Sequence, residues 1–141
     1  MTILDTNVLS ELMKPNPSPE VVAWTGSNLW SELFISAITQ VEILYGLDLL
    51  PSGKRKGALQ TAARLMFEED FSQRILPFDH IAAQHYASIV STRKKSGKPI
   101  SQFDAQFASI AKSRGANVST RNESDFSNCG ITIINPWKYK V

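Results

Sequence analysis

The chain has 141 residues, of which 43% are hydrophobic and 20% are charged, and its formal net charge at pH 7 is +2. This size and composition are typical of a globular protein, and we expect residues 1–141 to form a single domain with a buried core. No apolar run approaches the roughly 20 residues that a membrane-spanning helix needs, and the N-terminus lacks the pattern of a signal peptide. Cys129 is the only cysteine, so an internal disulfide is excluded and we expect a cytoplasmic protein.

The first dozen residues determine how the rest of the chain is organised. A short apolar run, Ile3-Leu4, stops at Asp5, and apolar residues at helical spacing follow. This pattern predicts a buried strand that ends at a carboxylate and turns into a helix. In open α/β sheets, ligands bind beyond the carboxyl ends of the strands, which is where Asp5 would lie. The alternative is that Asp5 only caps the helix that follows it.

Strand and helix patterns alternate along the remaining chain. We predict strands over residues 33–36, 75–78, 116–119 and 131–134, and helices over 19–27, 39–50, 57–71 and 101–114, with a further helix that Asp79 caps and that ends before Ser96. The proline inside 75–78 favours an edge position for that strand. Strands separated by helices of this length predict a three-layer α/β/α sandwich with a mostly parallel central sheet.

Three acidic residues repeat one local pattern, in which the acid lies three residues after a helix-capping residue. The pairs are Thr39 with Glu42, Ser101 with Asp104, and Asn122 with Asp125. This spacing is that of the capping box, which would explain each acid by helix stability alone.

Two of these acids, Glu42 and Asp104, also begin the apolar faces of their helices, so we expect them to point inward. A buried carboxylate needs a counter-charge, and neither acid has a basic residue one helical turn away. If these acids converge with Asp5 and Asp125, two charges about 4 Å apart would repel by roughly 4 kcal/mol at an effective dielectric constant of about 20. A divalent cation would relieve this repulsion, and ligands that are all oxygen favour Mg²⁺ or Mn²⁺.

A cation held by carboxylates and water is suited to the hydrolysis of phosphodiester bonds. Basic residues form small clusters that could contact a nucleic-acid backbone, although solvated helix ends are an equally simple explanation. The clusters are Lys54 to Lys56, Arg93 to Lys95 with Lys98, Lys112 with Arg114, and Lys138 with Lys140.

Four motifs, in order and spread over nearly the whole chain, resemble one known family. They are Ile3–Glu11, Ser36–Gly46, Phe103–Ala111 and Ser119–Phe126, and the closing Asn135–Trp137 is similar to one subgroup of that family. On these motifs the sequence resembles the PIN-domain ribonuclease toxins of the VapC type, which belong to type II toxin–antitoxin systems. The resemblance implies the same parallel α/β/α sandwich and a Mg²⁺-dependent endoribonuclease.

The resemblance also assigns residues to the site. It implies that Asp5, Glu42 and Asp104 are active-site acids and metal ligands, with Asp5 and Asp104 holding the Mg²⁺ (or Mn²⁺) most directly. Thr6 and Thr120 resemble the hydroxyl residues that the family places beside the acids.

The fourth acidic position remains open, because some members have Asp where this chain has Asn122. Either Asp125 serves instead, or the amide oxygen of Asn122 does. The resemblance further implies a homodimer, an RNA substrate, and an antitoxin protein that covers the acidic cleft.

Two other functions remain possible at this point. A haloacid-dehalogenase-like phosphatase also begins with a strand that ends in Asp, but it has a second Asp two residues later, where this chain has Asn7. The other possibility is a PIN-like module that binds a partner without cleaving RNA.

Overall fold

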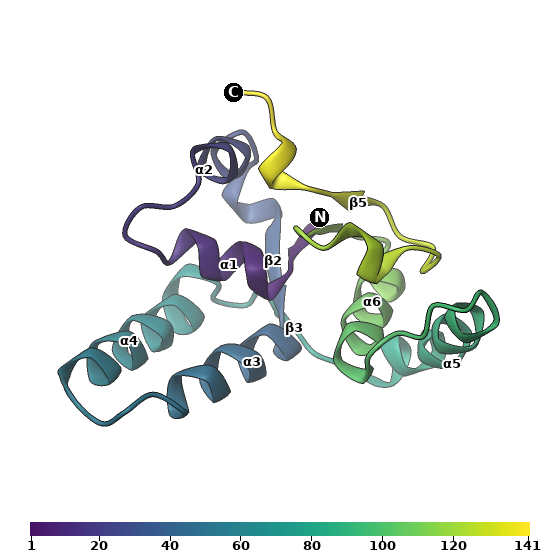
Figure 1. Ribbon diagram of the computed structural model, residues 1–141, viewed down its shortest axis with the longest axis horizontal. Helices are drawn as coiled ribbons and strands as arrows, with labels where there is room; N and C mark the ends of the chain where they lie inside the picture. Colours follow the sequence, from purple (N-terminus) through teal and green to yellow (C-terminus); the bar gives the residue numbers. More distant parts are fainter.

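The computed structural model describes residues 1–141, and its centre is a five-stranded sheet in the order β3-β2-β1-β4-β5 (Figure 1). The strands are β1 (Thr2–Leu4), β2 (Leu33–Ser36), β3 (Ile75–Leu76), β4 (Asn117–Ser119) and β5 (Ile133–Ile134). Every neighbouring pair is parallel. The first strand, predicted to be buried, lies at the centre of the sheet.

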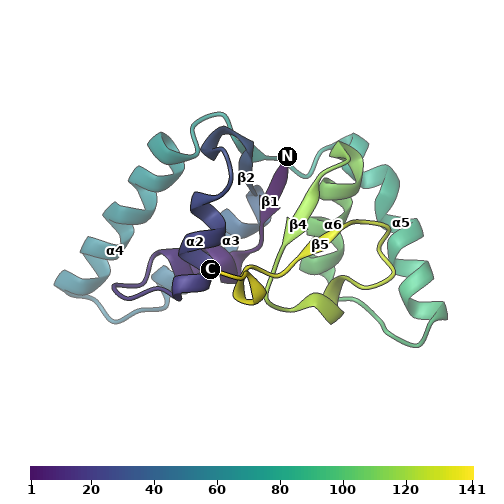
Figure 2. The same ribbon diagram turned by 90° about the horizontal axis from the view of Figure 1, so that it is seen from above.

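Six α-helices surround the sheet. They are α1 (Thr6–Leu12), α2 (Pro19–Gly26), α3 (Ala37–Asp48), α4 (Lys54–Leu65), α5 (His80–Lys95) and α6 (Gln102–Arg114). Short 3-10 helices cover Trp30–Glu32, Glu123–Phe126 and Pro136–Lys138, and a π-helical turn, Met66–Asp70, continues α4. Figure 2 shows α4 at one end of the molecule and α5 at the other, with the central strands between them.

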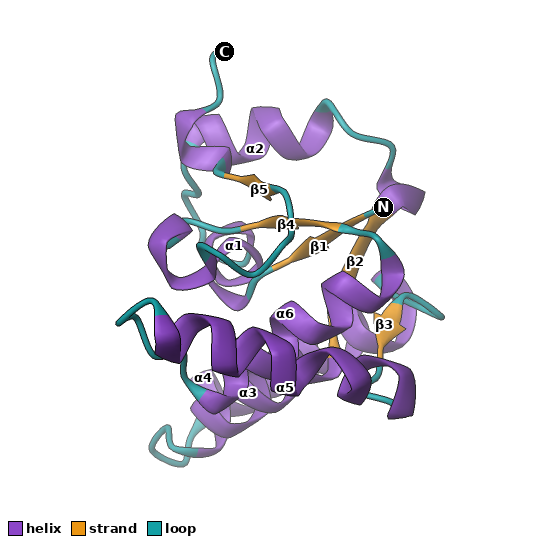
Figure 3. Ribbon diagram, turned by 90° about the vertical axis from the view of Figure 1, so that its right-hand side faces the viewer, coloured by secondary structure: helices purple, strands orange, loops and turns teal.

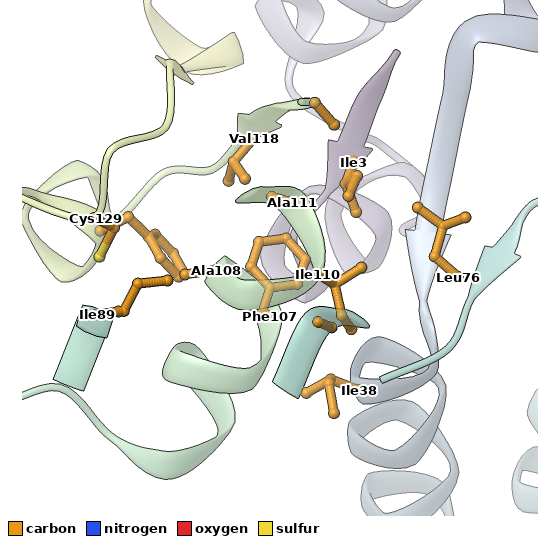
Figure 4. Close-up of a cluster of buried hydrophobic side chains, with 13 residues drawn as sticks. Ile3, Ile38, Leu76, Ile89, Phe107, Ala108, Ile110, Ala111, Val118 and Cys129 are labelled. Atoms are coloured by element: carbon orange, nitrogen blue, oxygen red, sulfur yellow. The ribbon is translucent and has the colours of Figure 1, made fainter. Parts of the chain in front are cut away.

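The sheet separates two hydrophobic cores. Ile3 belongs to the core beneath α6, together with Phe107 and Ile110, whereas the next residue, Leu4, belongs to the core that contains Val8 of α1. Figure 4 shows the first of these cores, and Figure 3 shows α2 on one side of the sheet with α5 and α6 on the other. Because successive strand residues point to opposite faces, both faces are covered, and the predicted three-layer α/β/α sandwich is confirmed.

The start of α3 differs from the prediction. The hydroxyl of Ser36 accepts a hydrogen bond of 3.2 Å from the backbone N–H of Thr39, so Ser36 is the cap and the helix begins at Ala37. The capping box predicted for Thr39 and Glu42 is therefore wrong. The physical reason is that Ser36, which ends β2, already satisfies the free N–H groups at the start of the helix.

Two predicted helix caps agree with the structure, whereas α4 begins at Lys54 rather than at residue 57, and β5 begins at Ile133 rather than at Ile131. Asp79 caps α5 by accepting from the N–H of Ala82 at 2.9 Å, and Ser101 caps α6 by accepting from the N–H of Asp104 at 3.1 Å. Strand β3 lies at the edge of the sheet, as predicted, but it ends at Leu76 rather than at residue 78, since Pro77 has no N–H for the ladder. None of the helices combines the length and the apolar character that crossing a bilayer would need.

Candidate active site

The four predicted acids lie at the edge of the sheet where the central strands end. Asp5 follows β1 directly, and Glu42 lies in α3, the helix that follows β2. Asp104 is in the first turn of α6, and Asp125 is in the 3-10 helix that follows β4. The topology thus places all four acids in one region, because parallel strands end at the same edge of a sheet.

The ionisation of these acids reflects their burial and their proximity. The pKa of Asp5 is raised to about 6; burial is the main cause, the hydrogen bonds from Thr120 and Thr6 oppose it, and the charges of Asp104 and Glu42 add to it. Burial is also the main cause of a raised pKa at Asp104, to which the charges of Asp125 and Glu42 contribute. Carboxyl groups that resist ionising together in this way are typical of a cation-binding or catalytic site.

Asp5 uses its two carboxylate oxygens for different purposes. Its Oδ1 accepts a hydrogen bond of 2.8 Å from the N–H of Thr6, so Asp5 does cap α1. Its Oδ2 accepts from the hydroxyl of Thr120 at 2.8 Å and from the side-chain amide of Asn7 at 3.3 Å. The capping role and a place in the site are therefore compatible, because each uses its own oxygen.

Glu42 lies at the rim of the site. The hydroxyl of Thr6 donates a hydrogen bond of 2.7 Å to Oε1 of Glu42 and lies 3.0 Å from the hydroxyl of Thr39. The prediction that Glu42 points inward is wrong, since its side chain is exposed. Helix α3 turns Ile38 and Ile43 toward the core, and Glu42 lies beside that buried face rather than on it.

The side chain of Asp104 is half-buried, which agrees with the predicted inward direction. Asp125, by contrast, has no capping role. The side chain of Asn122 makes no capping hydrogen bond, and the N–H of Asp125 donates instead to the backbone carbonyl of Asn122 at 3.1 Å. The N–H of Asn122 donates to the hydroxyl of Thr120 at 3.1 Å. The capping box predicted for Asn122 and Asp125 is therefore absent, and helix capping does not account for the Asp125 carboxylate.

Asn7 also belongs to this site, although it was not predicted there. Its amide nitrogen lies 3.3 Å from both Oδ2 of Asp5 and the hydroxyl of Thr120, and its Oδ1 accepts from the N–H of Arg121 at 3.3 Å. Asn7 thereby holds the end of β1 against the end of β4. Its position in the sequence, two residues after Asp5, could have indicated that it lies beside that acid.

Arg93 was also missed, because it stands in a run of basic residues at the end of α5. Its side chain is only 4% exposed, and it donates to the backbone carbonyl of Asp125 at 2.6 Å and to that of Lys98 at 2.6 Å. Its positive charge opposes the increase that burial causes in the pKa of Asp104. Nothing in the spacing of that basic run indicates that its first member is buried.

A comparison with known proteins identifies the family. The family model described as PIN domain matches residues 2–130. The chain belongs to the PIN-domain family. This PIN domain is 40% identical over 138 residues to VapC ribonuclease Y4jK of Sinorhizobium fredii, a match that covers 98% of this chain and 99% of that protein. It is 39% identical over 137 residues to toxin FitB of Neisseria gonorrhoeae, covering 97% of this chain and 99% of FitB.

The solved structures agree with the sequence matches. The structure of FitAB bound to IR36 DNA fragment superposes on this PIN domain with a TM-score of 0.93 and 38% identity, covering 100% of this chain and 99% of that one. Together, the matches show that this PIN domain is of the VapC toxin type.

The oxygen atoms of this PIN domain's site fit one mode of Mg²⁺ binding. No three acidic, histidine or cysteine side chains lie close enough to enclose an ion by themselves. Mg²⁺, however, usually binds through one or two carboxylates and keeps several waters. The carboxylates of Asp5 and Asp104, beside the hydroxyl of Thr120, form a donor set of hard oxygens that suits this mode.

Proposed function

We propose that this PIN domain is a Mg²⁺-dependent endoribonuclease and the toxin of a type II toxin–antitoxin system. Its relatives over the full length of the chain are named as a ribonuclease and a toxin. The observation that supports cleavage most strongly is the gathering of Asp5, Glu42, Asp104 and Asp125 at the carboxyl edge of the sheet, with the pKa of Asp5 and of Asp104 raised first by burial and then by neighbouring charges.

The proposed metal ligands are Asp5 and Asp104, with Glu42 completing the set. Bound there, Mg²⁺ or Mn²⁺ would activate a water molecule and neutralise charge on the phosphate. The chain's own hydrogen bonds orient the acids for this purpose. Thr120 fixes one oxygen of Asp5, and Thr6 fixes one oxygen of Glu42, at 2.8 and 2.7 Å respectively.

The second oxygen of the exposed Glu42 carboxylate has no partner in the protein, so it is free to complete the metal ligands either directly or through the attacking water. Asp125 adds a negative charge next to Asp104, and we assign it the fourth acidic position in preference to Asn122. The phosphatase alternative lacks its second acid, because Asn7 contributes an amide that donates to Asp5.

Three partners follow from this function. The substrate is RNA, and the match to the FitAB structure supports an antitoxin partner. We propose that this antitoxin covers the acidic cleft. We also propose a homodimer, because Val41, Leu44 and Tyr45 lie exposed on one face of α3. We expect the dimer to act in the cytoplasm.

Cleavage of labelled oligonucleotides by the purified protein tests the proposal. We expect single-stranded RNA to be cut when Mg²⁺ is present, EDTA to stop the reaction, and added Mg²⁺ to restore it. A DNA strand of the same sequence, and the Asp5→Asn variant, serve as controls. RNA that stays intact with Mg²⁺ would favour the non-cleaving binding module, and cleavage that persists in EDTA would exclude a metal-dependent site.

A further inference from the structure

Two ion pairs lie beside Arg121, which belongs to neither of them. The hydrogen bond from Lys14 is the main cause that lowers the pKa of Glu11, and the charge of Arg121 adds a smaller effect. Lys14 pairs with Glu11 at 3.0 Å, and Lys138 pairs with Glu123 at 2.6 Å. The side chain of Arg121 forms neither an ion pair nor a hydrogen bond within the protein, and it is exposed. Its guanidinium therefore keeps all of its N–H donors available for a ligand.

Arg121 is nevertheless held in place. Its guanidinium carbon lies 5.2 Å from the centre of the Trp137 ring, which is half-buried and packs against the core beside α1. Its N–H donates to Asn7 at 3.3 Å, and its carbonyl accepts from the side chain of Asn135 at 3.5 Å. A guanidinium stacked on an aromatic ring loses little further freedom when it binds a ligand.

The position of Arg121 relates it directly to the acids. It follows Thr120, whose hydroxyl donates to Asp5, and its N–H binds the same Asn7 side chain that donates to Asp5. The other arginine close to the acids, Arg93, is buried and uses its donors on backbone carbonyls. Arg121 is thus the arginine at the site that can reach a ligand from solvent.

We propose that Arg121, supported by Trp137, binds a phosphate of single-stranded RNA next to the one that is cleaved. The inference rests on the proposed ribonuclease function and adds the course of the substrate, which runs from the acids across the loop after β4 toward Trp137. A guanidinium fork matches the two free oxygens of a phosphate, and such a contact is independent of base sequence.

The test measures RNA binding and its salt dependence in the Asp5→Asn background, which prevents cleavage. We expect Arg121→Met to weaken binding about tenfold. A plot of log affinity against log salt concentration, between about 50 and 200 mM, should become shallower by about 0.7, which is the value for one phosphate contact on a single strand. Arg121→Lys should keep the slope and lose part of the affinity, because it retains the charge without the fork. Arg114→Met removes an exposed arginine at the far end of α6 and should match the parent protein.

The cleaving enzyme supplies a second measurement. There Arg121→Met should raise KM about tenfold with little change in kcat, because the contact binds substrate in the ground state and the transition state alike. An unchanged salt slope, or a lower kcat at unchanged KM, would overturn the inference. If the wild-type protein cleaves RNA but Arg121→Met binds it as well as the parent does, this inference fails alone; if the wild-type protein neither binds nor cleaves RNA, the proposed function fails with it.

Discussion

The hydroxyl of Thr120 donates a hydrogen bond of 2.8 Å to Oδ2 of Asp5, across 115 positions of sequence. The contact follows from the register of the sheet, because Leu4 of β1 pairs with Ser119 of β4 and the next residue of each strand is a site residue. The parallel pairing of β1 with β4 therefore places Thr120 next to Asp5 at the ends of the two strands. This contact fixes the direction of one Asp5 oxygen while the other caps α1.

Replacing Thr120 by valine should affect both stability and activity. The change keeps the shape of a fully buried side chain but removes the donor to Asp5 and the acceptor for the N–H of Asn122. We expect the free energy of unfolding to fall by about 1–3 kcal/mol and RNA cleavage to fall about tenfold. Urea denaturation and initial rates measure the two effects, and Thr120→Ser, which keeps the hydroxyl, should lose little. A valine variant with wild-type activity would show that this hydroxyl is dispensable.

The raised pKa of Asp5 predicts how stability depends on pH in the metal-free protein. The pKa is 3.8 in an ordinary setting and about 6 in the folded protein, so the folded state holds this proton more tightly. The resulting stabilisation is present at low pH, is lost as pH rises from about 4 to about 6, and amounts to about 3 kcal/mol. Asp5→Asn should remove this dependence.

The asparagine variant should also be at least as stable as wild type at pH 7, because asparagine still caps α1 and carries no charge. Thermal unfolding at several pH values, without metal, measures this difference. A variant whose melting temperature at pH 7 is several degrees below that of wild type would contradict the conclusion that burial opposes the ionisation of Asp5. Added Mg²⁺ should stabilise the wild type and leave the variant unchanged.

Asp125→Asn separates the two explanations for the fourth acid. Since Asp125 takes part in no capping box, we expect the melting temperature to stay within about a degree of wild type. The loss of its charge should raise the Mg²⁺ concentration needed for half-maximal cleavage several-fold. Asn122→Ala is the matched variant, because it removes the only other oxygen proposed for this position. If that variant, and not Asp125→Asn, raises the Mg²⁺ requirement, the amide of Asn122 is the ligand.

The proposed homodimer depends on the exposed apolar face of α3. Light scattering should give the mass of a dimer at micromolar concentration, and Leu44→Glu, which places a charge on a side chain that is 47% exposed, should give a monomer. Leu29→Glu is the control, since Leu29 is 73% exposed outside α3 and should leave the dimer intact. A wild-type monomer in the absence of antitoxin would contradict this part of the proposal.

The fold was largely predictable because strand and helix patterns are local. The run that ends at Asp5, the cap at Asp79 and the edge position of β3 each follow from a few neighbouring residues. The cap of α3 was missed because two adequate capping residues, Ser36 and Thr39, lie one turn apart, and the end of β2 selects the first.

The site was less predictable where it depends on contacts between distant segments. The apolar spacing around Glu42 does not reveal that it lies at the edge of the buried face, beside Thr6 of another helix. Arg93 resembles the exposed lysines that follow it, and only the packing of α5 against the loop around Asp125 buries it. Spacing along the chain identifies candidate acids. The residues that contact those acids are brought there by tertiary structure and cannot be read from the spacing.

The measurement that tests the central claim most directly is a Mg²⁺ titration of RNA cleavage by wild type and Asp104→Asn. Asp79→Asn is the control, because Asp79 caps α5 and lies near Arg114 at the other end of α6. We expect saturable, chelator-sensitive cleavage by wild type and by the control. In Asp104→Asn we expect kcat to be lower by at least about a hundredfold, since several kcal/mol of transition-state stabilisation are lost. Wild-type cleavage by Asp104→Asn across the titration would contradict this expectation.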